Sequence, residues 1–326
     1  MNKHMMYVGV DVGQDEVWAV VRGSKPRMFR NGEAGIRDLG TWAHTRAKGM
    51  GVHFCLEATG VYGRTVAVRL LKGHYGDVSI VNPAQIAAYA RAQLRRTKTD
   101  GVDAQVILSF AQSQQPTPWT PEPPALRQLI HLVTQADAMR EDLRRWSNRR
   151  HTEKYTDDLP ATVRTSTTRI IQGLRRQLAN LERAINELLD ASPELKQQVE
   201  LLCSIPGIAQ LSAVRLLAYG RNTITTYSAR ALVAHAGLAT RHRQSGRTVR
   251  GKSRLAKQGD RRLRTALYMP ALVGIKHNSR LQPFYQRLVD AGKPKKLAIA
   301  ACMKKLLVIS RAVLLNKKTF KPEFLT

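Results

Sequence analysis

This chain is poor in cysteine, has no long apolar run and carries few acidic residues, and each shortage excludes a class of protein. Its three cysteines (Cys55, Cys203 and Cys302) are far apart and lack metal-ligand spacing, which is typical of buried thiols in a reducing cytosol rather than of a disulfide framework. The nine histidines are scattered too, so no zinc site is expected. No run of about 18 uncharged apolar residues is present to span a bilayer, and the N-terminus lacks the apolar core of a signal peptide. We therefore expect a cytoplasmic protein without a membrane partner.

The shortage of acidic residues points to a polyanionic partner. The chain has 53 lysine and arginine residues against 24 acidic ones, a net charge of +29. The excess is concentrated in residues 196–326, which hold 26 basic and four acidic residues. Such an asymmetry predicts a nucleic-acid-binding face in the last part of the chain, with salt-dependent binding. The length of 326 residues and an apolar content of 43% predict about two domains with real cores.

Residues 1–115 alternate between strand and helix patterns. Two β-branched runs, 6–12 and 17–22, are separated by a turn signal and predict an antiparallel hairpin. Further strands are expected at 52–57 and 78–81, and each follows a segment with a helical pattern. The expected helices cover residues 35–48, 61–72 and 100–112. This mixed α/β layout, with acidic residues at strand ends, indicates by analogy a ribonuclease H-like core.

Five prolines between residues 116 and 124 interrupt the helical pattern and predict a linker. A long helical region follows, and residues 157–160 (DDLP) are expected to break it into two arms. Its apolar stripe, at steps of three and four, fits packing within one chain and a helix pair between two chains equally well. The stripe consists of Leu174, Leu178, Leu181, Ile185 and Leu188. Residues 116–195 are therefore assigned to a proline linker and a helical coiled coil.

Four carboxylates come from three segments of the first domain. Asp11 and Glu57 each end a strand, while Asp100 and Asp103 are three residues apart and share one face of a helix. Taken singly, Asp11 could be a turn residue after its strand, and Asp100 and Asp103 could simply cap their helix. Taken together they predict a shared Mg²⁺ site, because hard divalent cations prefer oxygen ligands and like charges held this close repel without a cation.

The basic domain, residues 196–326, carries two candidate sites. Residues 202–217 resemble a helix-hairpin-helix, in which the turn at Pro206 and Gly207 presents backbone N–H groups to a DNA phosphate. A plain helical corner remains the alternative. Farther on, Ser245 is expected in a loop, within a segment that holds ten lysine and arginine residues between Arg241 and Arg264. A serine needs a base, a metal or a cationic setting to act as a nucleophile, so composition alone favours a binding surface there.

Sequence motifs change the balance between a binding surface and a catalytic serine. Residues 8–13 (VGVDVG), 57–62 (EATGVY), 82–83 (NP) and 98–104 (KTDGVDA) resemble the DEDD transposases of the "IS one-ten" insertion sequences, which are related to Piv-type invertases. The later motifs resemble the second domain of the same family. They are residues 205–208 (IPGI), 236–238 (AGL), 244–246 (QSG) and 257–264 (KQGDRRLR). The resemblance covers nearly the whole chain in order and spacing.

The resemblance implies a RuvC-like (ribonuclease H-like) α/β domain over residues 1–115, a coiled coil, and a mainly α-helical transposase domain over residues 196–326. It implies that Asp11, Glu57, Asp100 and Asp103 bind Mg²⁺ and that Ser245 is the catalytic serine. It also implies donor and target DNA, a structured bridge RNA as guide, and a dimer or tetramer formed through the helical region. The setting implied is bacterial or archaeal and nucleoid-associated. The expected nucleic-acid-binding residues are Pro206, Gly207, Arg241, Arg243, Arg247, Arg250, Lys252, Arg254, Lys257, Arg261 and Arg264.

Three other functions stay open at this point. A metal-dependent RuvC-like nuclease or junction resolvase would use water as its nucleophile and would tolerate loss of Ser245. A sugar-kinase-like ATPase would also place an acidic residue at a phosphate turn such as 8–13, but no later glycine-rich phosphate loop is present. A non-catalytic nucleic-acid-binding protein would not depend on Asp11.

Overall fold

The computed structural model describes residues 5–58, 60–93, 100–245 and 249–322, with the side chains of 241–254 left out. The chain divides into two compact units, Met1–Pro121 and Glu122–Thr326. Across these described ranges, no helix combines the length and the apolar character that a membrane span requires.

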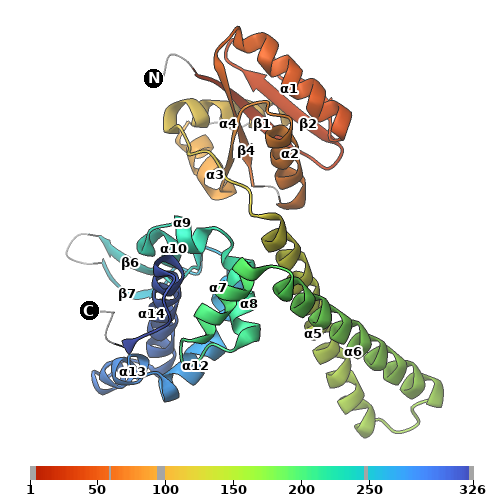
Figure 1. Ribbon diagram of the computed structural model, residues 1–326, viewed down its shortest axis with the longest axis vertical. Helices are drawn as coiled ribbons and strands as arrows, with labels where there is room; N and C mark the ends of the chain where they lie inside the picture. The colour runs from red at the N-terminus through yellow and green to blue at the C-terminus, as the bar shows by residue number, and fades with distance from the viewer. Residues whose placement is uncertain (1–4, 59, 94–99, 246–248, 323–326) are drawn as a thin grey trace. The chain divides into compact units, whose positions relative to one another are not determined.

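The first unit is built on a five-stranded mixed sheet (Figure 1). Its order is β3-β2-β1-β4-β5. The pairs β3–β2 and β2–β1 are antiparallel, and the pairs β1–β4 and β4–β5 are parallel. The predicted hairpin is confirmed, while β3 was not predicted, since it has only four residues and two of them are arginines. The strands are β1 (Met5–Val12), β2 (Glu16–Val21), β3 (Arg27–Arg30), β4 (Gly51–Glu57) and β5 (Asp77–Val81).

Two pairs of helices cover the two faces of this sheet. Helices α1 (Glu33–Ala47) and α2 (Gly60–Lys72) pack on the face that carries Val8, Val10 and Phe54. Helices α3 (Pro83–Ala92) and α4 (Asp100–Gln114) pack on the opposite face, where Cys55 and Val81 contact the apolar side of α4. Side chains alternate between the two faces along a strand. A strand residue that directly precedes or follows one packed against α1 therefore points toward α4.

Helix α4 approaches strand β1 more closely than any side chain would permit. A Cβ atom added at Gly9 would lie 2.3 Å from the carbonyl oxygen of Ala104 and 2.4 Å from the backbone N of Leu108. Glycine is therefore required at this position, because the backbone of α4 occupies the space of its side chain. The first turn of α4 is thereby held against the same strand that carries Asp11.

The proline-rich segment lies along β5, the edge strand of the sheet. The backbone N–H of Trp119 donates to Val78 O over 2.7 Å, and the hydroxyl of Ser79 donates to the carbonyls of Pro116 and Thr117 over 3.0 and 2.7 Å. This arrangement pairs part of an otherwise open strand edge.

The second unit begins with a long helical hairpin. Helix α5 (Pro124–Thr152) leads through a short 3₁₀ turn (Glu153–Tyr155) into α6 (Ala161–Asp190), so the predicted break at residues 157–160 is confirmed. The remaining elements form a helical body with one β-hairpin (Figure 1). They are α7 (Pro193–Cys203), α8 (Gln210–Gly220), α9 (Thr223–Thr226), α10 (Ala229–His235), β6 (Thr240–Ser245), β7 (Val249–Leu255), α11 (Arg261–Ala266), α12 (Tyr268–His277), α13 (Leu281–Asp290) and α14 (Lys295–Asn316).

Only the base of the α5–α6 hairpin joins the core of the second unit. Its buried contributions to that core come from the start of α5, through Ala136, and from the end of α6, at Ile185 and Leu189. Leu178, Leu181 and Leu188 of the predicted stripe are half-buried against this core. Most of the stripe therefore packs within the chain, while Leu174 lies outside this core, and among the described residues the core contacts of the hairpin come from its base.

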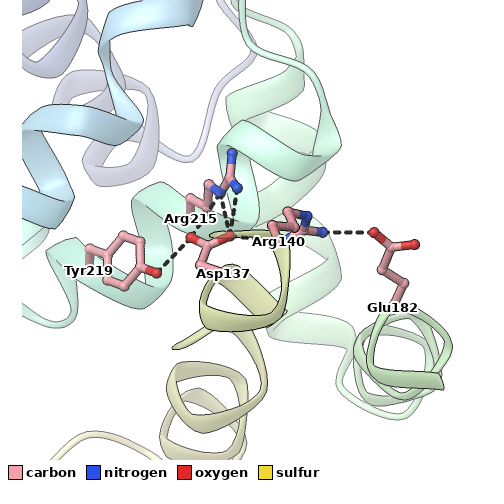
Figure 2. A network of polar contacts seen from close by, with 5 residues as sticks. All are labelled: Asp137, Arg140, Glu182, Arg215 and Tyr219. Carbon is pink, nitrogen blue, oxygen red and sulfur yellow. Dashed lines mark hydrogen bonds and ion pairs between the residues drawn. The ribbon is translucent and has the colours of Figure 1, made fainter. Parts of the chain in front are cut away.

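A polar network fastens α5 to α8 at the base of the hairpin (Figure 2). Asp137 accepts hydrogen bonds from Arg215, whose Nε lies 3.0 Å from both carboxylate oxygens, and from the hydroxyl of Tyr219 over 2.7 Å. Arg140 bridges Asp137 and Glu182 of α6, over 2.8 Å to each. Burial alone would raise the pKa of Asp137, but the hydrogen bonds from Arg215 and Tyr219 outweigh it and hold the pKa below its ordinary value.

We predict that Gly9→Ala destabilises the first unit by about 1 to 3 kcal/mol or more, because the new methyl group must displace the backbone of α4. Gly101→Ala is the matched control within α4, where the nearest atoms to an added Cβ are 3.4 Å away on Pro26. Urea unfolding followed by Trp fluorescence measures both. Equal stability of Gly9→Ala and the wild type would contradict the close approach.

We predict that Asp137→Asn costs about 2 kcal/mol of unfolding free energy, since Arg215 and Tyr219 then lose a charged acceptor that is half-buried. Asp142→Asn serves as the control, because its ion pair with Arg145, at 3.5 Å, is exposed and such pairs contribute about 0 to 1 kcal/mol. Thermal unfolding at neutral pH compares the two. Similar losses in both variants would show that the network does not fasten the hairpin.

Candidate metal and serine sites

The fold places the four predicted carboxylates around the carboxyl ends of β1 and β4. Asp11 follows Gly9 by two residues, so its side chain lies on the face of β1 that α4 covers. The parallel register pairs Val10 with Leu56, which brings the next residues, Asp11 and Glu57, to the same end of the sheet. Asp100 and Asp103 lie in the first turn of α4.

Electrostatic coupling joins these groups. The pKa of Asp11 rises from its ordinary value of 3.8 to about 6. Burial is the largest cause, and the negative charges of Asp103, Asp100 and Glu57 follow in that order, opposed by a hydrogen bond from the backbone of Val12. Two other elements, α4 and β4, therefore direct negative charge toward one half-buried carboxylate of β1, and the role of these residues in metal binding stays a prediction.

The chemistry of these donors fits a hard divalent cation. Four carboxylates supply only oxygen ligands, and a cation among them would relieve the repulsion that raises the pKa of Asp11. Within the part of the chain that the structure describes, no three His, Cys, Asp or Glu side chains are yet arranged as a metal-binding group. The donor set is thus suitable in kind, and binding would require the carboxylates to draw closer together.

Trp18 is a further residue of this region that sequence reasoning missed. It is the cross-strand partner of Asp11 in the antiparallel register of β1 and β2, and its ring packs near the start of α4 beside Gly101. Its indole Nε1 is buried and finds no acceptor among the described residues. An aromatic residue in a strand ordinarily indicates core packing, so no sequence signal distinguished it.

Ser245 ends strand β6 of the second unit. The structure forms an antiparallel hairpin from β6 and β7, called here the serine hairpin, in which Ser245 pairs with Val249 and Thr240 with Leu255. The sequence predicted a loop over this segment. The strands were missed because arginine, glycine and polar residues interrupt the β pattern. The predicted contacts of Arg241, Arg243, Arg247, Arg250, Lys252 and Arg254 lie outside the described side chains.

Two glycine motifs hold the base of the serine hairpin. Gly259 has a φ of +137°, and an added Cβ there would lie 2.3 Å from the carbonyl oxygen of His235. Gly237, with a φ of +65°, leaves room for Arg264, whose Nη1 donates to the carbonyls of Ala236 and Lys257 over 3.1 and 3.3 Å. The motifs at 236–238 and 257–264 thus meet in space and set where the hairpin leaves the helical body.

Asp260 completes this base as the N-cap of α11. Its carboxylate accepts from the backbone N–H of Leu263 over 2.8 Å, and its own N–H donates to His235 O over 2.6 Å. Lys257 and Arg261 remain exposed around it and available for an anion, while Arg264 is engaged inside the protein. The single acidic residue of the basic segment therefore has a structural role.

The predicted helix-hairpin-helix forms a tight corner between α7 and α8. Gly207 has a φ of +107°, and an added Cβ would lie 2.7 Å from Pro270 O and 2.8 Å from the backbone of Gly274 in α12. The carbonyl of Pro206 accepts from the side chain of buried Asn278 over 3.3 Å. Packing against α12 accounts for the glycine, and phosphate binding by Pro206 and Gly207 stays a prediction.

Comparisons with known proteins match the regions that contain these residues. A model of the DEDD-type IS110 transposases, described as Transposase, matches residues 8–152 and so includes all four carboxylates. A second model, described as Transposase IS116/IS110/IS902 family, matches residues 199–286, which include the serine hairpin.

Curated relatives match over the same span. The pilin gene-inverting proteins of Moraxella bovis and Moraxella lacunata are each 32% identical over 324 residues, covering 96% of this chain and 97% of theirs. A 42 kDa protein of insertion element IS900 from Mycobacterium paratuberculosis is 28% identical over 177 residues, covering 54% of this chain and 43% of its own length. The resemblance drawn from the sequence motifs is confirmed, and the chain belongs to the IS110 family of transposases, enzymes that recombine DNA.

Proposed function

We propose that this transposase cuts and rejoins DNA through a phosphoserine intermediate, with Ser245 as the nucleophile and a Mg²⁺ site formed by Asp11, Glu57, Asp100 and Asp103. The observation that carries the proposal is the negative charge that α4 and β4 direct toward Asp11 of β1, in a chain whose net charge is +29. A cation site in such a chain is suited to phosphate chemistry. The strand order and the β1–β2 hairpin also support assigning the first unit to the RuvC-like fold.

In the proposed reaction the Ser245 oxygen attacks a DNA phosphorus atom. An Oγ–P bond forms, the bond from phosphorus to one sugar oxygen breaks, and the serine proton is transferred to that released oxygen, which becomes a hydroxyl. The phosphodiester energy is kept in the protein–DNA ester, so a sugar hydroxyl can reverse the step and rejoin a strand without ATP. The cationic residues of the segment, including exposed Lys257 and Arg261, would hold the phosphate and its added negative charge.

The metal would be held by the four carboxylates and would supply Lewis-acid stabilisation of the attacking or departing oxygen. The chain's own part is to present these carboxylates from a rigid sheet and a closely packed helix. The close contact at Gly9 supports this role, because it fixes the first turn of α4 against the strand that carries Asp11.

Partners beyond DNA follow from the family resemblance. A bridge RNA would carry target specificity by base pairing, which leaves the protein to recognise backbone and shape. A dimer or tetramer would bring the carboxylates of one subunit to the serine of another. The relatives named for pilin gene inversion support a role in rearranging DNA segments.

The alternative is a metal-dependent nuclease or junction resolvase in which water is the nucleophile. The acidic cluster around Asp11 favours it as much as the first proposal, since the same carboxylates would serve. The two functions separate on Ser245 alone.

We predict that Asp11→Asn stabilises the metal-free protein above pH 6. The folded state holds the Asp11 proton up to about pH 6, and the unfolded chain releases it near 3.8, so wild-type stability falls as pH rises between these values. In EDTA at pH 7.5 the variant should therefore be more stable by about 1 to 2 kcal/mol, a figure discounted for the partial exposure of the carboxyl. Below pH 4 the difference should vanish.

The same protein pair tests the metal. Added Mg²⁺ should raise the melting temperature of the wild type and leave that of Asp11→Asn nearly unchanged, with exposed Asp38→Asn as a control that behaves like the wild type. If Mg²⁺ shifts Asp11→Asn as much as the wild type, the ion binds elsewhere.

We predict that Ser245→Ala abolishes the covalent protein–DNA adduct and strand exchange, while DNA binding stays within about twofold of the wild type, because one neutral hydroxyl contributes little to backbone affinity. Ser253→Ala, in the partner strand of the same hairpin, is the control and should keep the adduct. A denaturing gel after incubation with Mg²⁺, co-purified RNA and labelled DNA detects it. Cleavage without an adduct, equal in both variants, would assign the nuclease mechanism instead.

A further inference from the structure

The far end of the α5–α6 hairpin holds four exposed cations around two adjoining depressions. Arg150, Lys154 and Arg164 line a depression of about 380 Å³, and Arg150, Lys154 and Arg175 line a second of about 270 Å³. These four residues are called here the basic tip. Glu153, an acidic residue that lines the first depression, has its carboxylate engaged by the hydroxyl of Thr167 over 2.5 Å.

Some cationic side chains of the α5–α6 hairpin form ion pairs and others do not. Toward the base, Arg140 pairs with Asp137 and Glu182, while Arg144 and Arg145 pair with Glu141. At the basic tip, by contrast, none of the four side chains forms an ion pair with another described residue. Four positive charges against one lining carboxylate, Glu153, leave the tip with a net positive charge, which favours binding of an external anion.

Helix electrostatics explain only part of this pattern. Cations in the last turn of α5 interact favourably with the negative end of the helix dipole. Arg164 lies in the first turn of α6, where the dipole disfavours positive charge and no acidic residue is present. Its position is therefore unfavourable for the isolated hairpin. A bound polyanion would make the electrostatic interactions of Arg164 favourable.

Beside the cations, the tip carries an exposed aromatic residue. Tyr155 is 76% exposed, and its ring contacts the edge of His151, which lines the second depression, at a centroid distance of 5.4 Å. Exposed rings among unpaired cations are a common composition of nucleic-acid-binding surfaces. The depressions are open and lack the deep cavity that a small molecule would need.

We propose that the basic tip binds the phosphate backbone of duplex DNA, without reading its sequence, outside the reacting phosphates. The reach follows from the helix length, because 29 residues at about 1.5 Å per residue separate the tip from the start of α5 by roughly 40 Å. The inference rests on the DNA-recombining activity of the family and is independent of the serine chemistry. Duplex DNA is chosen because it is the family's substrate and a continuous polyanion.

A second copy of the chain is a poorer occupant for this surface. Two basic tips would repel each other, and the remainder of the chain is itself strongly cationic, at +29 overall. The tip region exposes two large apolar residues, Tyr155 and Val163, which offer too little apolar area for a stable dimer interface. Charge complementarity therefore favours a nucleic acid.

The test uses the full-length protein and a 30-bp duplex of arbitrary sequence, with binding followed by fluorescence anisotropy from 50 to 300 mM salt. The variants Arg150→Gln/Lys154→Gln and Arg164→Gln/Arg175→Gln each remove two charges from the basic tip. Arg144→Gln/Arg145→Gln removes two charges from the ion-paired part of the same helix and is the matched control. Circular dichroism melting shows whether all three remain folded.

Each tip variant should weaken DNA binding about tenfold near physiological salt and lower the slope of log K against log salt by about two, one for each phosphate that is no longer neutralised. The control should leave the slope unchanged. Equal effects in tip and control variants would reduce the tip to a share of the general field and overturn the proposal. Weaker binding confined to a structured RNA probe, or a change of oligomeric state by mass photometry without nucleic acid, would also overturn it. Because no cleavage is measured, failure here leaves the Ser245 adduct experiment unaffected.

Discussion

The close approach of α4 to β1 is the constraint on which the acidic site depends. Gly9 lets the backbone of the helix occupy the space of a side chain, and this brings the first turn of α4, with Asp100 and Asp103, toward the strand that carries Asp11. The parallel pairing of β1 with β4 adds Glu57 from the other side. The absence of a methyl group at Gly9 thus lets α4 come close enough to act on Asp11, while the strand pairing supplies Glu57.

The same electrostatic rule explains three different arrangements in this protein. At the base of the helical hairpin, Asp137 is satisfied by Arg215, Arg140 and Tyr219, and the network serves architecture. In the acidic site, burial and the negative charges of three neighbouring carboxylates together raise the pKa of Asp11. At the basic tip, four positive charges lie near a single lining acid, Glu153, and none of them forms an ion pair with a described residue. Charges that a fold leaves uncompensated mark the places that are suited to a ligand.

Glycines and one arginine give the second unit a comparable precision. Gly237 and Gly259 allow two chain segments to cross closely, and Arg264 ties their carbonyls together beneath the serine hairpin. Gly207 does the same where the α7–α8 corner meets α12. The motifs that resemble the family therefore contain scaffold residues as well as candidate reacting groups, and resemblance alone does not separate the two.

The sequence by itself determined the β1–β2 hairpin, the alternating strands and helices, the two helical arms and the family, because period and motif are local properties. It also identified the four carboxylates and Ser245 as candidates. Strand β3, helix α3 and the strands of the serine hairpin were missed, since short or arginine-rich segments carry weak periodicity. Only the tertiary structure decided that the carboxylates act on Asp11, that Arg264 is engaged internally and that the tip cations lack partners among the described residues. These are facts about through-space distance between residues far apart in the chain, and spacing along the sequence does not encode them.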